Sequence, residues 1–459
     1  MQTRRHHLQQ LLGTAALGGL SPLSAQTAPA KGKRPAPSER ITMALLGCGS
    51  QGTNDMRGFL QDDRVQVVAV ADPERESRRY KQSFKSAFGR EPARRTVDAH
   101  YAEQQGKSGA GDFCKAYEDF REVLARDDID AVLIATPDHW HVPMSILAAR
   151  AGKHIYCEKP VALTVAEGRA LCGEVEKAGV RFQVGSQQRS DIRFRMACEF
   201  IRNGRLGKIK RITVGLSSNN RDNNGHAAEF APAPVPASLN YDLWLGPCVG
   251  ELPFCPARLH SNWRWLWAHG GGNVTDFGAH HLDIMQWALD MDGSGPVEYF
   301  NPKAQWPAKG SFYQTPELFS FQARYANGVE VTVTDGQANK NGILFEGEDG
   351  RTLFVSRGVI RSNPADLLKD RIRPDEIHLY ESKSHSGNLI DCILENRSTI
   401  CPPEVGQRSA TIAHLGNIAL RLGRDLKWDP ATETILNDDE ASNLLGRPLR
   451  EPWDVISQA

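Results

Sequence analysis

The stretch Ile41 to Gly52, ITMALLGCGSQG, is an apolar run that ends in the spacing Gly47-x-Gly49-x-x-Gly52. It predicts a buried strand that turns into a helix around a phosphate. The first glycine permits the tight turn, the second lets the backbone approach a pyrophosphate, and the third lets the helix pack against the strand. The helix N-terminus then offers unpaired N–H groups to the anion. Because similar turns occur in flavin enzymes, methyltransferases and other α/β domains, the motif alone leaves dinucleotide binding open.

A carboxylate follows the next apolar run. Val65 to Ala71 reads as a second strand and ends at Asp72, twenty residues beyond Gly52. A carboxylate in this place accepts both ribose hydroxyls and repels a 2′-phosphate, which favours NAD over NADP. The alternative is that Asp72 only caps a helix beginning at Pro73.

Length and composition bound the class of protein. A chain of 459 residues is too long for one hydrophobic core and predicts two domains. Lysine plus arginine and aspartate plus glutamate both total 55, so the net charge gives no reason to expect nucleic acid or an anionic membrane as partner. The nine cysteines include no C-x-x-C pair and no Cys/His cluster at zinc spacing, so we expect no metal. Cys248 and Cys255 can pair after export, which the sequence leaves open.

The N-terminus resembles a twin-arginine export signal. Arg4-Arg5 precedes a weakly apolar run from Leu11 to Leu23 that is too short to span a bilayer as a mature helix, and small residues follow it. We therefore expect a signal at residues 1–30, a linker at 31–40, and a periplasmic or otherwise exported protein without membrane insertion after signal removal. Since no free NAD pool exists outside the cytoplasm, the cofactor of such a protein has to be held tightly and regenerated in place.

The chain from residue 41 to 185 alternates strands and helices, which predicts a doubly wound parallel sheet that binds NAD. The polar piece from Gly89 to Gly111 reads as an insertion or surface loop. The expected strands of this sheet are Ile41–Leu46, Val65–Ala71, Ala131–Thr136, His154–Cys157 and Arg181–Gly185.

Residues 186–459 form the expected second domain, an α/β substrate and oligomerisation domain. Turns such as Ala326-Asn327-Gly328 suggest a large, mainly antiparallel sheet. A tryptophan-rich region from Asn219 to Trp267 interrupts it, and aromatic side chains at an opening commonly stack on sugar rings. The expected strands are Lys208–Leu216, Leu318–Tyr325, Val329–Thr334, Ile343–Glu348 and Thr352–Ser356.

Three short motifs carry chemistry. Thr136-Pro137-Asp138-His139-Trp140-His141 and Glu158-Lys159-Pro160 each follow a strand of the first sheet, at the edge where such folds bind ligands. Lys159 can hydrogen-bond a substrate hydroxyl and stabilise the alkoxide that forms as hydride departs. The third motif is Gly270 to Asp283, in which a helix opened by Thr275 or Asp276 places Asp276 and His280 on one face. His280 can then take the hydroxyl proton.

A metal site of His280, His281 and Asp283 is the rival interpretation of the third motif. Adjacent histidines point in different directions on a helix, so we favour the version without metal.

Together these motifs resemble the glucose-fructose oxidoreductase, inositol dehydrogenase and rhizopine-catabolism family, written Gfo/Idh/MocA. The resemblance covers nearly the whole mature chain. The positions that match the catalytic lysine, aspartate and histidine of that family are Lys159, Asp276 and His280. The resemblance implies NAD or NADP, sugar or inositol substrates, and a homo-oligomer formed through the open sheet. The export signal, Trp263-Arg264-Trp265 and Arg450-Glu451-Pro452-Trp453 look like the exported branch of the family.

The sequence thus predicts two sets of binding residues, with NAD as cofactor and a small carbohydrate as substrate. Contacts to the cofactor are expected from Gly47, Gly49, Ser50, Gln51, Gly52, Asp72, Thr136, Pro137, His139, His141, Glu158, Lys159 and Gln187. Contacts to the substrate are expected from His139, Arg189, Arg258, His260, Trp263 and His281.

The leading hypothesis is an exported oxidoreductase that moves hydride between a sugar-like hydroxyl and tightly bound NAD. A redox-neutral NAD-dependent glycosidase is the alternative, because the same superfamily includes enzymes that oxidise a ring carbon, eliminate the aglycone and reduce the product again. A sugar-binding protein that retains NAD without catalysis is a third reading, and the complete set of Lys159, Asp276 and His280 argues against it.

Overall fold

The computed structural model describes residue 36 and residues 39–78, 86–106, 111–217 and 230–457. The expected signal at residues 1–30 and most of the expected linker lie outside the described residues, as do the first eleven residues of the tryptophan-rich region. None of the helices in the described ranges is long and apolar enough to cross a membrane.

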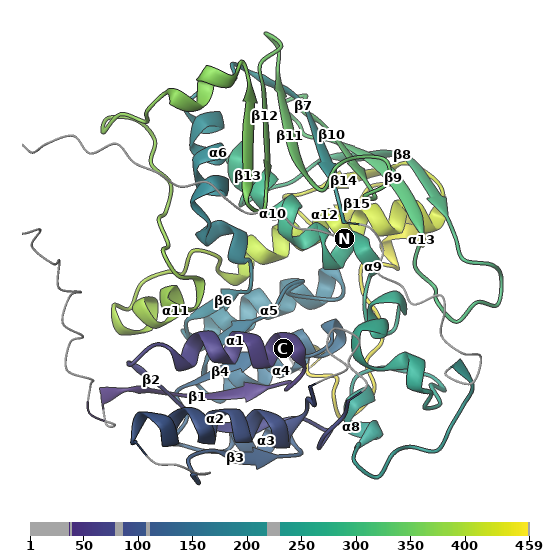
Figure 1. Cartoon of the computed structure of the whole chain (residues 1–459). Helices are drawn as coiled ribbons and strands as arrows, with labels where there is room; N and C mark the ends of the chain where they lie inside the picture. Colours follow the sequence, from purple (N-terminus) through teal and green to yellow (C-terminus); the bar gives the residue numbers. More distant parts are fainter. Residues whose placement is uncertain (1–35, 37–38, 79–85, 107–110, 218–229, 458–459) are drawn as a thin grey trace, which may run out of the picture.

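The first sheet is parallel and lies in the lower half of Figure 1. Its strand β1 sits in the middle, pairs with β2 on one side and β4 on the other, and is buried over nearly its whole length. This burial on both faces explains why the strands read as continuous apolar runs. In spatial order the strands are β3 (Lys115–Tyr117), β2 (Val65–Ala71), β1 (Ile41–Leu46), β4 (Ala131–Ile134), β5 (His154–Cys157) and β6 (Phe182–Val184).

Helices cover this sheet and include one that the sequence missed. The piece from Gly89 to Gly111 is not a surface loop, because α2 (Arg90–Gln104) occupies most of it and packs against β2. Its buried stripe of Ala93, Val97 and Tyr101 is narrow, and the polar residues around it hide the helical period. The other helices here are α1 (Ser50–Leu60), α3 (Phe120–Leu124), α4 (Asp138–Arg150), α5 (Val165–Ala178) and the short η2 (Gln187–Ser190).

The second sheet has nine strands and is mainly antiparallel, with β7 and β10 as a parallel pair. Together with the parallel first sheet it confirms the predicted fold class. The sequence missed four of these strands: β13, β14, β15 and β8. In β8, polar residues alternate with few apolar ones. In spatial order the strands are β13 (Val359–Asn363), β12 (Thr352–Ser356), β11 (Gly342–Gly347), β7 (Ile209–Gly215), β10 (Glu330–Thr334), β9 (Leu318–Arg324), β8 (Glu298–Gln305), β14 (Leu426–Asp429) and β15 (Thr434–Ile435).

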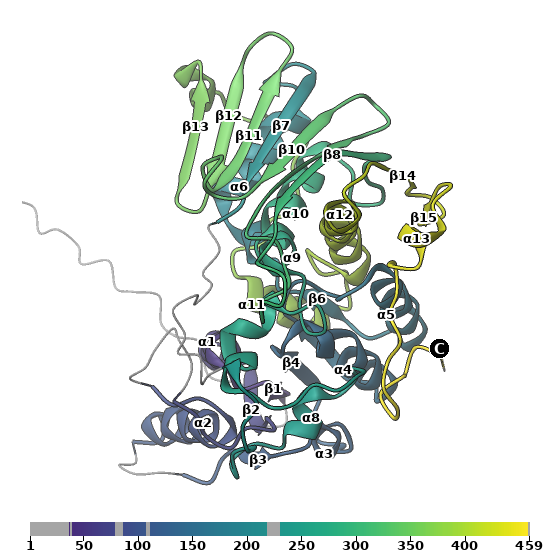
Figure 2. The same cartoon turned by 90° about the vertical axis from the view of Figure 1, so that its right-hand side faces the viewer.

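Three helices lie between the two sheets, as Figures 1 and 2 show. They are α6 (Ile192–Arg202), α10 (Gly278–Leu289) and α12 (Pro403–Leu422), and α12 contacts both β8 above and α5 below. One hydrophobic cluster runs through this layer from the first sheet into the second. The two sheets are therefore fixed relative to each other by a shared core.

The last part of the chain returns to the first sheet. Helix α11 (His385–Leu394) packs against α1, and Trp453 stacks edge-on against Trp140 with ring centroids 4.8 Å apart. The remaining short elements are α8 (Tyr241–Leu245), η3 (Pro256–Arg258), η4 (His260–Trp265), α9 (Gly272–Asp276), η5 (Ala365–Lys369) and α13 (Asp439–Ser442).

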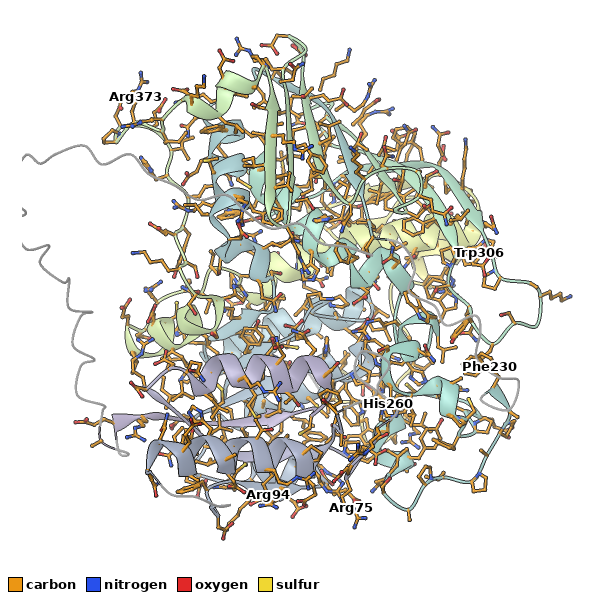
Figure 3. All side chains as sticks on the ribbon, in the orientation of Figure 1. Arg75, Arg94, Phe230, His260, Trp306 and Arg373 are labelled. Atoms are coloured by element: carbon orange, nitrogen blue, oxygen red, sulfur yellow. The ribbon has the colours of Figure 1, made fainter. Side chains whose placement is uncertain are left out.

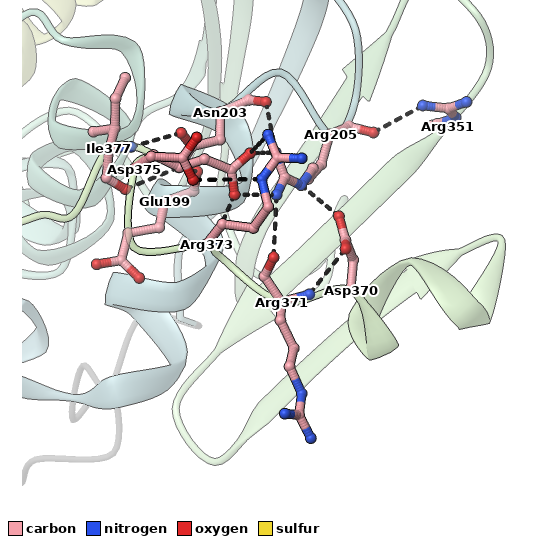
Figure 4. Close-up of polar contacts among 10 residues, drawn as sticks. Glu199, Asn203, Arg205, Arg351, Asp370, Arg371, Arg373, Asp375 and Ile377 are labelled. Atoms are coloured by element: carbon pink, nitrogen blue, oxygen red, sulfur yellow. Dashed lines mark hydrogen bonds and ion pairs between the residues drawn. The ribbon is translucent and has the colours of Figure 1, made fainter.

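The segment between the second sheet and α11 is attached to α6 by a polar network (Figure 4). Arg205 forms ion pairs with Asp370 and Glu376, and Asn203 exchanges hydrogen bonds with the backbone of Ile377. This network holds the segment that follows β13 against the residues just after α6.

Candidate active site

A cavity of about 840 Å³ opens at the carboxyl edge of the first sheet. Its walls come from the β1–α1 turn, the ends of β4 and β5, the 3₁₀ helix η4, and α9 with the start of α10. A cleft at this edge is where doubly wound sheets bind ligands, and its volume lies in the range of cofactor sites.

The glycine turn has the geometry that a pyrophosphate requires. Gly47 has φ of +94°, and a Cβ there would lie 2.7 Å from the carbonyl oxygen of Ala135. A Cβ on Gly52 would lie 2.1 Å from the carbonyl oxygen of Gly47. Gly49 caps α1 without a side-chain hydrogen bond, and the N-terminus of the helix, with its partial positive charge, lies at the cavity. Gly47, Gly49, Ser50 and Gln51 line the cavity, whereas Gly52 packs the helix against the strand.

Asp72 is buried at the rim of the same cavity. Its carboxylate accepts hydrogen bonds from the backbone N–H of Cys48 at 2.6 Å and of Glu74 at 2.8 Å. Burial raises the pKa of Asp72 to about 6, so the group is ionised at neutral pH. A fixed carboxylate one strand away from the glycine turn fits the ribose of NAD.

Four further expected cofactor residues line the cavity, namely Thr136, Pro137, Glu158 and Gln187. Gln187 Nε2 donates to Glu158 at 2.6 Å, and Gln51 Nε2 donates to Asp55 at 2.8 Å. Burial and the neighbouring Glu158 raise the pKa of Asp55 to about 9, and burial raises the pKa of Glu158 as well. Together, Asp55 and Glu158 therefore carry at least one proton at neutral pH.

His141 lines the cavity, but its ring joins two turns of the protein. Nδ1 lies 2.7 Å from the carbonyl oxygen of Pro160, and Nε2 lies 3.0 Å from that of Thr136. Burial lowers the pKa of His141 to about 4, so the ring is neutral at pH 7 and donates through one nitrogen only. His141 thus positions the turns that carry Pro137 and Lys159.

Lys159 and Asp276 form the central ion pair of the cavity. Lys159 Nζ donates to Asp276 Oδ1 at 2.8 Å and to the backbone carbonyl of Asp276 at 2.9 Å. Burial raises the pKa of Asp276, but Arg264 and Lys159 outweigh it and hold this pKa well below the usual range. The carboxylate therefore fixes the ammonium group at the cavity wall.

The helix around Asp276 differs from the prediction. Asp276 does not open a helix that continues to Trp287, because α9 ends at Asp276 and α10 begins at Gly278. The carbonyl that would accept the His280 N–H in a continuous helix accepts from Lys159 instead, and the His280 N–H donates to Phe277 at 3.1 Å. The break thus creates a second binding group for Lys159.

His280 lies on the same wall and lines the cavity. Burial, followed by the positive charges of Lys159 and Arg357, lowers the pKa of His280 well below its ordinary value. Its Nδ1 is buried and has no hydrogen-bond partner. The ring is therefore neutral at pH 7 and able to accept a proton. The carboxylate oxygens of Asp276 contact Lys159 and Arg264.

Two ionisable groups near this wall, Arg264 and Asp138, have no role predicted from the sequence. Arg264 Nε lies 3.1 Å from Asp276 Oδ2, so both carboxylate oxygens of Asp276 carry a cation. Asp138 is buried beside them, and burial together with Asp276 raises its pKa well above the usual range. The local sequence around Arg264 gives no sign of its contact with Asp276, because only the fold brings η4 next to α9.

Two of the expected substrate residues, His260 and Trp263, line the cavity. His260 marks the site in Figure 3, and its Nε2 lies 3.3 Å from the Ser77 hydroxyl. Trp244 and Trp265 line the cavity with them, which places aromatic rings of the tryptophan-rich region where a sugar ring would stack.

The other four expected substrate residues do not line the cavity, which corrects their assignment. Arg189 is fully buried in ion pairs with Asp283 and Asp292. His281 hydrogen-bonds Gln188 and Asn341, and Arg258 points at the ring of His269. His139, which was also an expected cofactor residue, lies at the Trp244 carbonyl with its ring completely buried. Each of these four side chains thus binds or contacts another group of the protein.

His139, Cys248 and His269 come together from three distant segments, with possible ligand atoms within 4.8 Å of one another. No cysteine in the described residues forms a disulfide, so Cys248 and Cys255 are both thiols. Cys248 Sγ lies 3.3 Å from His269 Nδ1, and Arg258 Nη1 lies 3.4 Å from His269 Nε2. The arginine favours the tautomer with the proton on Nδ1, which then points at the sulfur, and its positive charge opposes a cation.

The parallel sheet with its glycine turn, and the second domain that brings Asp276 and His280 to Lys159, define a two-domain NAD-binding oxidoreductase. The chain belongs to the Gfo/Idh/MocA oxidoreductase family, as the motifs predicted. Two family models match it: the NAD-binding Rossmann fold over residues 41–186, and the C-terminal alpha/beta domain over residues 195–455.

Individual relatives are distant. A glycosyl hydrolase family 109 protein of Shewanella pealeana is 26% identical over 225 residues, which is 46% of this chain and 45% of that protein. The rhizopine catabolism protein MocA of Rhizobium meliloti is 23% identical over 298 residues, 65% of this chain and 72% of that protein. The chain thus spans less than half of the Shewanella relative. The crystal structure of an aldose-aldose oxidoreductase from Caulobacter crescentus shares the fold, with a TM-score of 0.58, 22% identity, and coverage of 84% and 99% of the two chains.

Proposed function

We propose that this protein is an NAD-dependent oxidoreductase that transfers hydride between a secondary hydroxyl or hemiacetal of a sugar and the nicotinamide. The observation that carries the proposal is the Lys159–Asp276 ion pair beside a neutral His280, at the edge of a sheet that binds NAD. The names of an aldose oxidoreductase and of a rhizopine-catabolism protein among similar chains support a carbohydrate substrate.

Bound NAD supplies the hydride acceptor for the oxidation. Lys159 donates a hydrogen bond to the substrate oxygen and stabilises the charge that develops on it. His280 accepts the hydroxyl proton, and its lowered pKa keeps the ring in the neutral form that can do so. Asp276 contacts Lys159 and acts as a positioning residue for the ammonium group rather than for the histidine.

The export signal extends this proposal to a protein that is loaded with NAD in the cytoplasm, exported by the twin-arginine route, and reuses the nucleotide. The homo-oligomer expected through the open sheet belongs to the same proposal. Denaturing the purified mature protein and identifying the released nucleotide by mass tests retention. Stoichiometric NAD supports the model, and an empty protein that turns over only with added NAD contradicts retention.

The catalytic assignment is tested separately by Lys159→Met and His280→Ala. Each variant should bind NAD as the wild type does and lose turnover on a panel of aldoses and inositols. Normal turnover in either variant would remove that residue from the mechanism.

A redox-neutral glycosidase is the second candidate, because the Shewanella relative carries a glycosyl hydrolase name. It predicts cleavage of an aryl glycoside without added cofactor and without a net change in nicotinamide absorbance. Solvent deuterium should then enter the carbon next to the oxidised one. Cleavage without such exchange would count against this route.

A further inference from the structure

Arg357 is a cation of the cavity wall that no residue in the described chain neutralises. It lies in the turn between β12 and β13, and it lines the cavity together with Phe277 and His280. Its guanidinium carbon is 5.4 Å from the centre of the Phe277 ring. With the Gln188 amide oxygen turned toward it, Nε donates to that oxygen at 3.3 Å. These contacts orient the side chain and leave the two terminal nitrogens available.

The carboxylates of the same wall are already compensated. Asp276 binds Lys159 and Arg264, and Asp191 pairs with Arg193. Burial raises the pKa of Asp138 and of Glu158, which favours their neutral forms. Within the described ranges, Arg357 has no ion-pair partner, whereas exposed arginines such as Arg351 and Arg424 do have one. The reacting end of the cavity therefore carries an excess positive charge.

Arg357 and His280 both contact the ring of Phe277. The Phe277 ring contacts both, with 5.7 Å between its centre and that of the His280 ring. The guanidinium and the imidazole thus flank the same aromatic ring at the reacting end of the cavity. A planar guanidinium whose two terminal nitrogens are available binds a planar carboxylate through two parallel hydrogen bonds.

We infer that Arg357 forms a subsite for the carboxylate of an acidic sugar, so that the preferred substrate is a uronate or a related sugar acid. The carboxylate is a spectator in the reaction. The carbinol C–H transfers hydride to the nicotinamide, the hydroxyl proton goes to His280, and the carboxylate keeps its charge. This inference rests on the proposed function for its chemistry and adds the class of substrate.

The test compares matched pairs of sugars on the NAD-loaded protein. Glucuronate and galacturonate should have a higher kcat/KM than glucose and galactose, and Arg357→Gln should lower it for the uronates by about 10- to 100-fold through KM. Measured at a pH above the titration of His280, kcat/KM for the neutral sugars should fall much less than that for the uronates. Arg357→Lys keeps the charge without the fork and should fall in between. Arg361→Gln, in the exposed part of the next strand, is the control and should behave as the wild type.

Binding measured by calorimetry separates failure of this inference from failure of the proposed function. Uronate binding that Arg357→Gln abolishes supports the subsite even if no sugar is oxidised, an outcome that contradicts only the proposed function. A preference for neutral sugars, or an equal loss for neutral and acidic sugars in Arg357→Gln, overturns the subsite. A preference for hexose 6-phosphates over uronates overturns the carboxylate assignment, because the bound anion would then be a phosphate.

Discussion

Asp276 and Asp283 stand on the same stretch of chain, and each binds an arginine, but they do so in different surroundings. The Asp276 cluster, made of Asp276, Lys159 and Arg264, lies at the cavity wall with side chains 13–25% exposed. The Asp283 cluster joins Asp283 to Arg189, and both side chains are at most 2% exposed. Asp276 at the cavity wall and Asp283 in the core are thus only seven residues apart in the sequence.

The difference shows what each cluster contributes. The Asp283 cluster is complete within the protein, since Arg189 also binds Asp292 and Asp283 accepts from Ser409. Lys159 in the Asp276 cluster has two acceptors on one residue and faces the cavity, so a substrate oxygen can join it. We therefore expect changes in the Asp276 cluster to lower turnover at little cost in stability, and changes in the Asp283 cluster to do the reverse.

The largest effect is expected for Lys159→Met. Loss of the donor to the substrate oxygen should lower kcat by about 10³- to 10⁴-fold, or ~4–5.5 kcal/mol in activation free energy. Steady-state turnover measures it, and the NAD content reports whether the cofactor remains. Lys208→Met removes an exposed lysine and is the control. A loss of less than 10-fold would place Lys159 outside the chemistry.

Arg189→Met should act on stability instead. It leaves Asp283 as an unpaired charge in the core, which typically costs about 3–5 kcal/mol in the free energy of unfolding. Chemical denaturation measures this loss, and kcat per folded molecule should stay unchanged. The double variant Arg189→Met with Asp283→Asn should recover part of the loss, because the buried charge is gone. Arg193→Met, from a partly exposed pair, is the control. Loss of turnover without loss of stability would instead support Arg189 as a substrate-binding residue.

Arg264→Gln tests whether Arg264 and Lys159, the two cations bound to Asp276, have different roles. Asp276 keeps Lys159 but loses its second cation, so the ammonium group is held less well. We expect a fall in kcat of about 10-fold, since Arg264 positions Asp276 and makes no contact that replaces Lys159. The variant should unfold at nearly the same denaturant concentration as the wild type, because the pair is partly exposed. A fall as large as that of Lys159→Met would make Arg264 a catalytic residue.

The contrast between the clusters also explains what sequence can predict. The glycine turn and the buried strands could be predicted from the sequence, because Gly47 must adopt a positive φ and strands such as β1 must be apolar throughout. The helix α2 escaped prediction since only a narrow stripe of it is apolar. Which face of α10 meets the cavity depends on the break at Phe277, where the Asp276 carbonyl accepts from Lys159, a residue just after the distant strand β5.

The same reason accounts for the misassigned and missed residues. Arg189 and Arg357 are both arginines in polar local sequence, and only long-range contacts bury the first and expose the second to the cavity. His139, Cys248 and His269 likewise meet through packing that no local pattern signals.

The smallest expected effect is a shift in the pH at which protonation of His280 lowers kcat/KM. Burial and then the charges of Lys159 and Arg357 lower its pKa, and the neutral ring is the form that accepts the proton. Oxidation should therefore lose kcat/KM as the pH falls through a pKa below 6.5 and be constant above it. Arg357→Gln removes a positive neighbour and should move this limb to higher pH, whereas Asp276→Asn removes a negative neighbour and should move it to lower pH. Each shift should be less than about one pH unit, since the charges are partly screened. Asp283→Asn lies in the other cluster and should leave the limb in place, so a shift there as large as that of Asp276→Asn would contradict the separation of the two clusters.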